Sequence, residues 1–154
     1  MTGAVWSVRE LDIRYKPLRL PIPPPATTQL DGPREAARLA AAVLADLTVE
    51  QVIALYVNTK HRLIGVHRLS VGTLNEAPVH PRDVFKAACL ANAAGLILCH
   101  NHPSGDPTPS PDDHALVSRL RQAGELLGIE LLDALIVTDP GGTPYYSFRE
   151  AGVL

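Results

Sequence analysis

The chain has 154 residues, enough for one ordinary domain, and with 46% hydrophobic and 19% charged residues it can bury a core and need not be disordered. Its 14 basic and 16 acidic side chains give a formal charge of −2, which provides no global attraction to nucleic acid or acidic membranes. With two cysteines, no secretory signal and no apolar run of bilayer length, we expect a reducing, cytoplasmic setting, no disulfide scaffold and no membrane partner.

The first thirty residues predict an N-terminal strand followed by a proline-rich arm, and the main domain is expected over 31–154. Apolar and basic side chains alternate imperfectly up to residue 16, as is typical of an edge strand. Prolines at 21 and 23–25 then stop regular structure. The basic side chains could contact phosphates, although on an edge strand they more often keep that edge soluble. They are Arg9, Arg14, Lys16 and Arg19.

The remaining elements follow from apolar periodicity, helix-starting prolines and helix-ending glycines. Helices are expected over 33–47, from Pro81 to before Gly95, and over 111–127, and strands over 51–57, 63–71, 96–99, 130–137 and 145–148. The first two strands are separated by a short polar turn, which predicts a hairpin. The element order predicts a mixed α/β (α+β) fold with a largely antiparallel sheet flanked by helices.

Two histidines and an aspartate after the third predicted strand form a candidate metal site. Because side chains two residues apart on an extended chain point the same way, His100 and His102 leave the strand on one face. The prolines that follow restrict the loop, so Asp113, in the first turn of the next helix, is the natural third ligand. Two imidazoles and one carboxylate leave a coordination position open, which is the pattern of a catalytic zinc.

A purely structural interpretation of these residues is also open. Ser110 followed by Asp113, just before an apolar helix, is close to a capping box. A His-x-His pair at a strand end is by itself a weak metal signal. The combination of both patterns across a proline-rich loop favours a metal site, where Ser110 could donate a hydrogen bond to an oxyanion.

The run from His100 to Gly105, followed by Pro109, Ser110 and Asp113, resembles the metal motif of the JAB/MPN (JAMM) metallohydrolases. More narrowly, the chain resembles the bacterial RadC family, historically labelled DNA repair proteins. The likeness extends from about Pro33 to the C-terminus. It includes the segments 58–64, 72–75, 80–86, 91–94 and 123–128.

This resemblance implies a cytidine-deaminase-like fold of the JAB/MPN type and a zinc-dependent hydrolase that cleaves a peptide or isopeptide bond. The family's zinc ligands match His100, His102 and Asp113, and its motif serine matches Ser110. A glutamate before the first hairpin strand acts in active JAMM enzymes as general base toward the zinc-bound water. Glu50 stands in the corresponding place, and Glu76 is the second choice.

Other functions stay open at this point. Longer RadC proteins carry an N-terminal helix-hairpin-helix domain that suggests DNA contact, whereas here we expect a proline-rich arm in its place. A non-catalytic or accessory DNA repair protein with a structural metal site is therefore the main alternative to an enzyme. A metal-dependent nuclease ranks last, because two histidines and one aspartate do not resemble a two-metal phosphodiester site. The expected partner is an unidentified protein or peptide substrate, DNA is weakly supported, and the N-terminal strand could pair two chains as a homodimer.

Overall fold

Helices and strands follow one another along the chain in the order that the sequence predicts. The structure is a computed structural model that describes residues 7–21, 29–44, 46–72 and 79–154. Its elements are α1 (Pro33–Leu44), β1 (Gln51–Val57), β2 (Leu63–Val71), α2 (Pro81–Leu90), β3 (Gly95–Asn101), α3 (Pro111–Leu127), β4 (Glu130–Val137) and β5 (Tyr145–Ser147). The predicted mixed α/β fold is confirmed, and helix α1 ends three residues earlier than expected.

The five strands form one sheet in the order β2-β1-β3-β4-β5. Strands β3 and β4 are parallel, because helix α3 returns the chain to the same end of the sheet before β4 begins. The other neighbouring pairs are antiparallel. The sheet is therefore mixed and largely antiparallel, as predicted.

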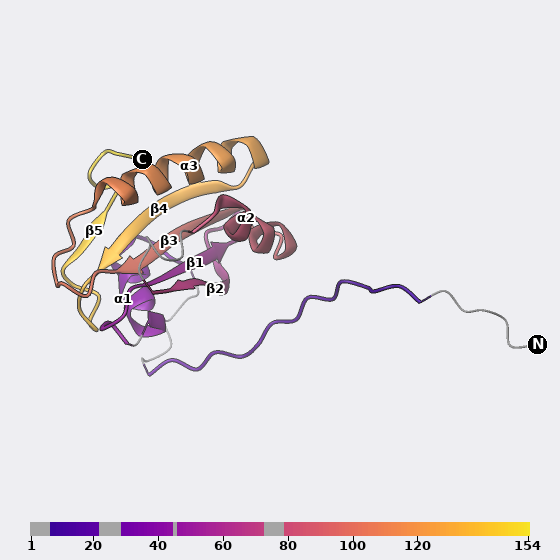
Figure 1. Cartoon of the computed structure of the whole chain (residues 1–154), viewed down its shortest axis with the longest axis horizontal. Helices are drawn as coiled ribbons and strands as arrows, with labels where there is room; N and C mark the ends of the chain where they lie inside the picture. The colour runs from indigo at the N-terminus through magenta and orange to yellow at the C-terminus, as the bar shows by residue number, and fades with distance from the viewer. Residues whose placement is uncertain (1–6, 22–28, 45, 73–78) are drawn as a thin grey trace, which may run out of the picture.

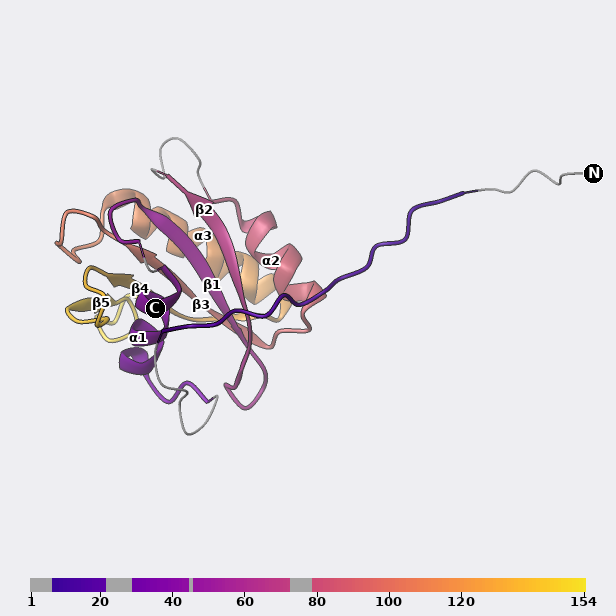
Figure 2. The same cartoon turned by 90° about the horizontal axis from the view of Figure 1, so that it is seen from below.

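Helices cover both faces of this sheet, so its central strands are apolar on both sides. Helix α1 packs on one face, whereas α2 and α3 lie on the other (Figures 1 and 2). Strand β1 is buried along its whole length and divides its side chains between the two layers. Ile53 and Leu55 pack toward α1, and Val52, Ala54 and Tyr56 pack toward α2 and α3. This arrangement explains the continuous apolar run in the sequence.

The helix boundaries follow the predicted capping signals closely. The side chain of His80 accepts a hydrogen bond from the backbone N–H of Arg82 at the start of α2, and Pro81 occupies the first helical turn. Helix α3 begins after Ser110 and ends at Gly128, which adopts the left-handed conformation with φ 69°. The start of α3 is important for the site, because it places Asp113 beside the end of β3.

The expected N-terminal strand is not formed. Residues 7–20 pair with no strand in the part of the chain that the structure describes, and toward the N-terminus the segment extends away from the domain (Figure 1). Val8 and Leu11 are 75% and 76% exposed. Alternation is necessary for a half-buried strand, but a strand also needs hydrogen bonds to a neighbouring strand. This segment forms no such ladder among the described residues, although Leu20 packs against the core on the α1 side. Most of the predicted proline-rich connector (22–28) lies outside the described residues, so the domain boundary near residue 30 stays a prediction.

No helix in the described ranges is long and apolar enough to cross a bilayer.

The turn before β5 depends on a glycine packed against α1. Gly142 has a φ of +78°, and a Cβ placed there would lie 2.7 Å from the backbone N and Cα of Arg38. Gly152 has a similar φ of +74° but open space around it. We expect both Gly→Ala variants to lose stability from the left-handed backbone, and Gly142→Ala to lose about 1–3 kcal/mol more because α1 must shift. Urea denaturation would measure the difference, and equal losses would show that α1 does not pack against this turn.

Candidate metal centre

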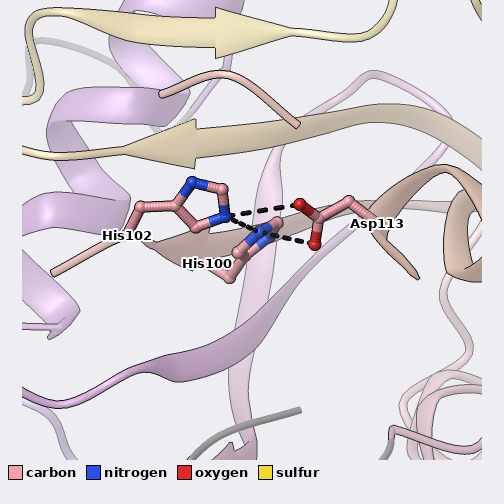
Figure 3. A group of neighbouring side chains, drawn as sticks. All are labelled: His100, His102 and Asp113. Atoms are coloured by element: carbon pink, nitrogen blue, oxygen red, sulfur yellow. Dashed lines mark hydrogen bonds and ion pairs between the residues drawn. The ribbon is translucent and has the colours of Figure 1, made fainter. Parts of the chain in front are cut away.

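His100 near the end of β3 and His102 directly after the strand both lie on the face of the sheet that α3 covers. The side chain of His100 is 3% exposed and that of His102 is 16% exposed. Their Nε2 atoms lie 3.1 Å apart, and Figure 3 shows both rings turned toward Asp113. The residue between them, Asn101, projects to the opposite face. The same-face placement predicted from the spacing of the two histidines is therefore present.

Helix α3 contributes Asp113, whose two carboxylate oxygens have different surroundings. Oδ2 accepts a 2.7 Å hydrogen bond from the backbone N–H of Ser110, and the Ser110 hydroxyl accepts one from the N–H of Asp113 at 3.2 Å. Oδ1 lies 3.1 Å from Nε2 of His100, yet it is buried without a hydrogen-bond partner. The capping box and the metal site, which were alternatives in the sequence, are thus compatible, because the cap leaves Oδ1 free.

The loop after β3 fixes the proton on the ring of His102. The backbone carbonyl of Asp106 lies 2.9 Å from Nδ1 of His102. A carbonyl oxygen can only accept, so Nδ1 carries the proton and, in the neutral ring, Nε2 carries a lone pair. That lone pair is directed toward Oδ2 of Asp113, 3.3 Å away. Hydrogen bonding of the far ring nitrogen to a carbonyl is the usual way in which proteins orient a metal-binding histidine.

The electrostatics of the group favour a cation. Burial raises the pKa of Asp113, but the neighbouring His100 and His102 outweigh burial and hold that pKa well below its usual range. The interaction with Asp113 raises the pKa of His102, although burial lowers it. The Asp106 carbonyl and the charge of Glu50 also raise this pKa. The site thus holds an ionised carboxylate and stabilises positive charge beside it.

The three ligand groups have the spacing that a small metal ion requires. One ligand atom from each of His100, His102 and Asp113 can be chosen so that all lie within 4.8 Å of one another. Ligands at about 2.0–2.1 Å in a tetrahedral site lie roughly 3.4 Å apart, close to the 3.1 to 3.3 Å separations here. A cation bound between these residues would satisfy both Oδ1 of Asp113, which has no hydrogen-bond donor, and the lone pair on Nε2 of His102, which faces the carboxylate. The residues therefore fit a metal ion.

Glu50 stands one residue before β1, and its charge acts on His102. Val52 is paired with His100 across the β1–β3 ladder, and continued alternation would put Glu50 on the same face. Glu50 is half-buried, and its charge contributes to the raised pKa of His102. The structure thus places Ser110 in contact with Asp113 and Glu50 within electrostatic range of His102, whereas the second choice, Glu76, lies outside the described residues.

Two polar groups around the ligands were not identified from the sequence. The Asp106 carbonyl orients His102, and backbone carbonyls have no sequence signal beyond their place in a turn. Asn101 is fully buried and hydrogen-bonded to the segment before β1. The alternation that places both histidines on one face could have placed Asn101 on the other. It could not have identified the hydrogen-bond partners of Asn101, which lie about fifty residues earlier in the sequence.

Comparison with known proteins agrees with the resemblance seen in the sequence. The family model of the RadC-like JAB domain matches residues 30–153. A UPF0758 protein of Shouchella clausii is 50% identical over 80% of this chain and 52% of its own length, and one of Thermotoga maritima is 51% identical over 68% and 46%. A UPF0758 protein of Clostridium perfringens is 39% identical over 97% and 63%. The chain spans about half the length of the first two of these curated relatives, and it belongs to the RadC-like JAB domain family.

Proposed function

We propose that the protein is a zinc-dependent hydrolase that cleaves an amide bond, of the peptide or isopeptide kind, with an activated water. The observation that carries the proposal is the buried group of His100, His102 and Asp113, in which Oδ1 of Asp113 has no hydrogen-bond partner. A half-buried carboxylate, that of Glu50, acts electrostatically on His102, and this supports a catalytic rather than a purely structural use.

The three ligand residues would hold the zinc ion, leaving a position open for the reactants. A bound Zn²⁺ supplies a Lewis acid that polarises a carbonyl and lowers the pKa of a coordinated water. Asp113 contributes a full negative charge because its pKa is held low, and the Asp106 carbonyl keeps the lone pair of His102 on Nε2.

Glu50 would transfer the proton in this reaction. Its carboxylate accepts a proton from the attacking water as the new C–O bond forms at the substrate carbonyl carbon. It then donates that proton to the amide nitrogen as the C–N bond breaks, so the products are a carboxylic acid and an amine. The position that continued alternation would give Glu50, on the same face as His100, supports this role.

Ser110 would stabilise the negative charge that develops on the carbonyl oxygen. Its hydroxyl oxygen accepts from the N–H of Asp113, and this leaves the hydroxyl proton available to a substrate. One hydroxyl would thus accept a hydrogen bond in the helix cap and donate one to the oxyanion, so the site needs no additional buried polar group.

Zinc binding is testable by substitution. We expect purified wild-type protein to retain close to one zinc per chain after gel filtration, and His100→Ala to retain much less, because the remaining ligands cannot enclose the ion. Inductively coupled plasma mass spectrometry measures the content. The matched control is His80→Ser, which changes an exposed histidine and keeps a capping hydroxyl at the start of α2. Equal zinc in His100→Ala and wild type would contradict the assignment.

Zinc affinity should also depend on pH with a defined sign. The pKa of His102 in the metal-free protein is raised above 6.5, so a proton occupies this ligand over a wider pH range than in a free histidine. Zinc must displace that proton, and its affinity should therefore fall as the pH decreases through neutrality. Competition with a chelator between pH 5.5 and 8.5 (roughly the range over which histidines titrate) measures this, and a pH-independent affinity would exclude a histidine ligand.

Replacement of the proposed base separates catalysis from metal binding. Glu50→Gln should lower turnover of a pool of internally quenched fluorogenic peptides by about 10²–10⁴-fold, because the amide cannot accept the proton. Zinc content should stay at the wild-type level. Glu130→Gln, at the opposite end of the sheet, is the matched control and should leave turnover unchanged.

Unchanged turnover in Glu50→Gln would exclude this residue as the base. If zinc-loaded wild type cleaved no peptide but bound duplex DNA with salt-sensitive affinity, the accessory DNA role would replace the proposed hydrolase.

A further inference from the structure

The residue between the two histidines anchors a different part of the chain. Asn101 is 0% exposed, and its side chain makes three hydrogen bonds to the backbone just before and at the start of β1. Its Oδ1 accepts from the N–H of Gln51 at 2.8 Å. Its Nδ2 donates to the carbonyls of Val49 at 2.9 Å and Leu47 at 3.2 Å.

These bonds hold the chain immediately before and after Glu50. The backbone pairing of β1 with β3 ends at Val52 and His100. At the next position the Asn101 side chain, rather than the backbone of β3, accepts the hydrogen bond from the N–H of Gln51. The backbone carbonyl of Glu50 itself accepts a 2.8 Å hydrogen bond from the N–H of Gly72, which follows β2. The backbone that carries the Glu50 carboxylate is therefore fixed from β3 and from the end of β2.

Other bonds in this region secure the end of α1. The Gln51 side chain donates to the carbonyls of Leu44 and Asp46, and the Arg68 guanidinium donates to Gln51 and to the carbonyl of Val43. Through Asn101, by contrast, the segment is attached to the strand that carries the metal ligands. A shift of this attachment would change the distance from Glu50 to the ligand group directly.

We propose that Asn101 is a positioning residue that holds Glu50 in register with the metal ligands His100 and His102. The inference rests on the proposed function of Glu50. The end of β3 directs His100 and His102 to one face of the sheet. From the other face, the Asn101 side chain holds the backbone on both sides of Glu50. The task requires an acceptor and two donors on one short side chain, which asparagine supplies and which aspartate, leucine and serine do not.

Amide exchange and paramagnetic shifts test the placement without a substrate. In Asn101→Ala, the Gln51 amide should exchange at least about tenfold faster than in wild type, with the Leu55 amide in the middle of β1 as internal reference. With Co²⁺ as the probe ion, the pseudocontact shifts of the Glu50 and Gln51 amides should change, whereas that of Leu116 in α3 should not. Asn101→Ser, which is too short to reach the three partners, provides the second variant if the alanine protein does not fold.

A matched control is Asp133→Asn, which alters another buried polar network, formed with Ser147 and the N–H of Arg149. It should leave the exchange of Gln51 relative to Leu55 at the wild-type value. If Gln51 stays protected and Glu50 keeps its shifts in Asn101→Ala or Asn101→Ser, the proposal is overturned.

Turnover of the fluorogenic peptides gives a readout that a merely structural role would not produce. Zinc-loaded Asn101→Ala should show kcat lowered by about 10- to 100-fold with KM and zinc content unchanged, because a displaced base slows the chemical step alone. Wild-type kcat in this variant would overturn the positioning role. Absence of turnover in zinc-loaded wild type would instead overturn the proposed hydrolase, while the exchange and Co²⁺ experiments still decide whether Asn101 sets the place of Glu50.

Discussion

The carboxylate of Asp113 is the group on which the site depends most. It is 1% exposed and ionised, and such a charge is tolerated in a protein interior only with compensating partners. One oxygen completes the N-terminal cap of α3, and the other faces His100 without a hydrogen bond. The first contact fixes where the helix begins, and the second requires a cation or protonated imidazoles nearby. Formation of α3 and assembly of the site are therefore linked through one side chain.

Strand β3 provides the second constraint, since it serves both faces of the sheet. His100 and His102 face the α3 layer, and Asn101 faces the segment that follows α1. An extended chain alternates its side chains strictly, so the ligands and the anchor cannot move independently. A strand buried on both sides gives a rigid base for such a site, as a loop would not.

Much of the fold and of the ligand group was predictable from the sequence because the signals were local. Helix α3 begins and ends where predicted, since Ser110, Pro111 and Gly128 all favour the same boundaries. The histidine pair followed from strand alternation, and Asp113 from a capping pattern. The prediction of an N-terminal strand was wrong because strand pairing depends on a partner edge, which local alternation does not reveal. The role of Asn101 was missed because its partners are backbone groups about fifty residues away in the sequence.

We infer that His100, His102 and Asp113 form one zinc site with an open position. X-ray absorption at the zinc edge, on zinc-loaded wild-type protein, tests this most directly. Zinc held by these residues should show a first shell of nitrogen and oxygen at about 2.0–2.1 Å with outer-shell scattering from two imidazole rings. A sulfur shell at about 2.3 Å, or the absence of imidazole scattering, would place the metal elsewhere and exclude this ligand set.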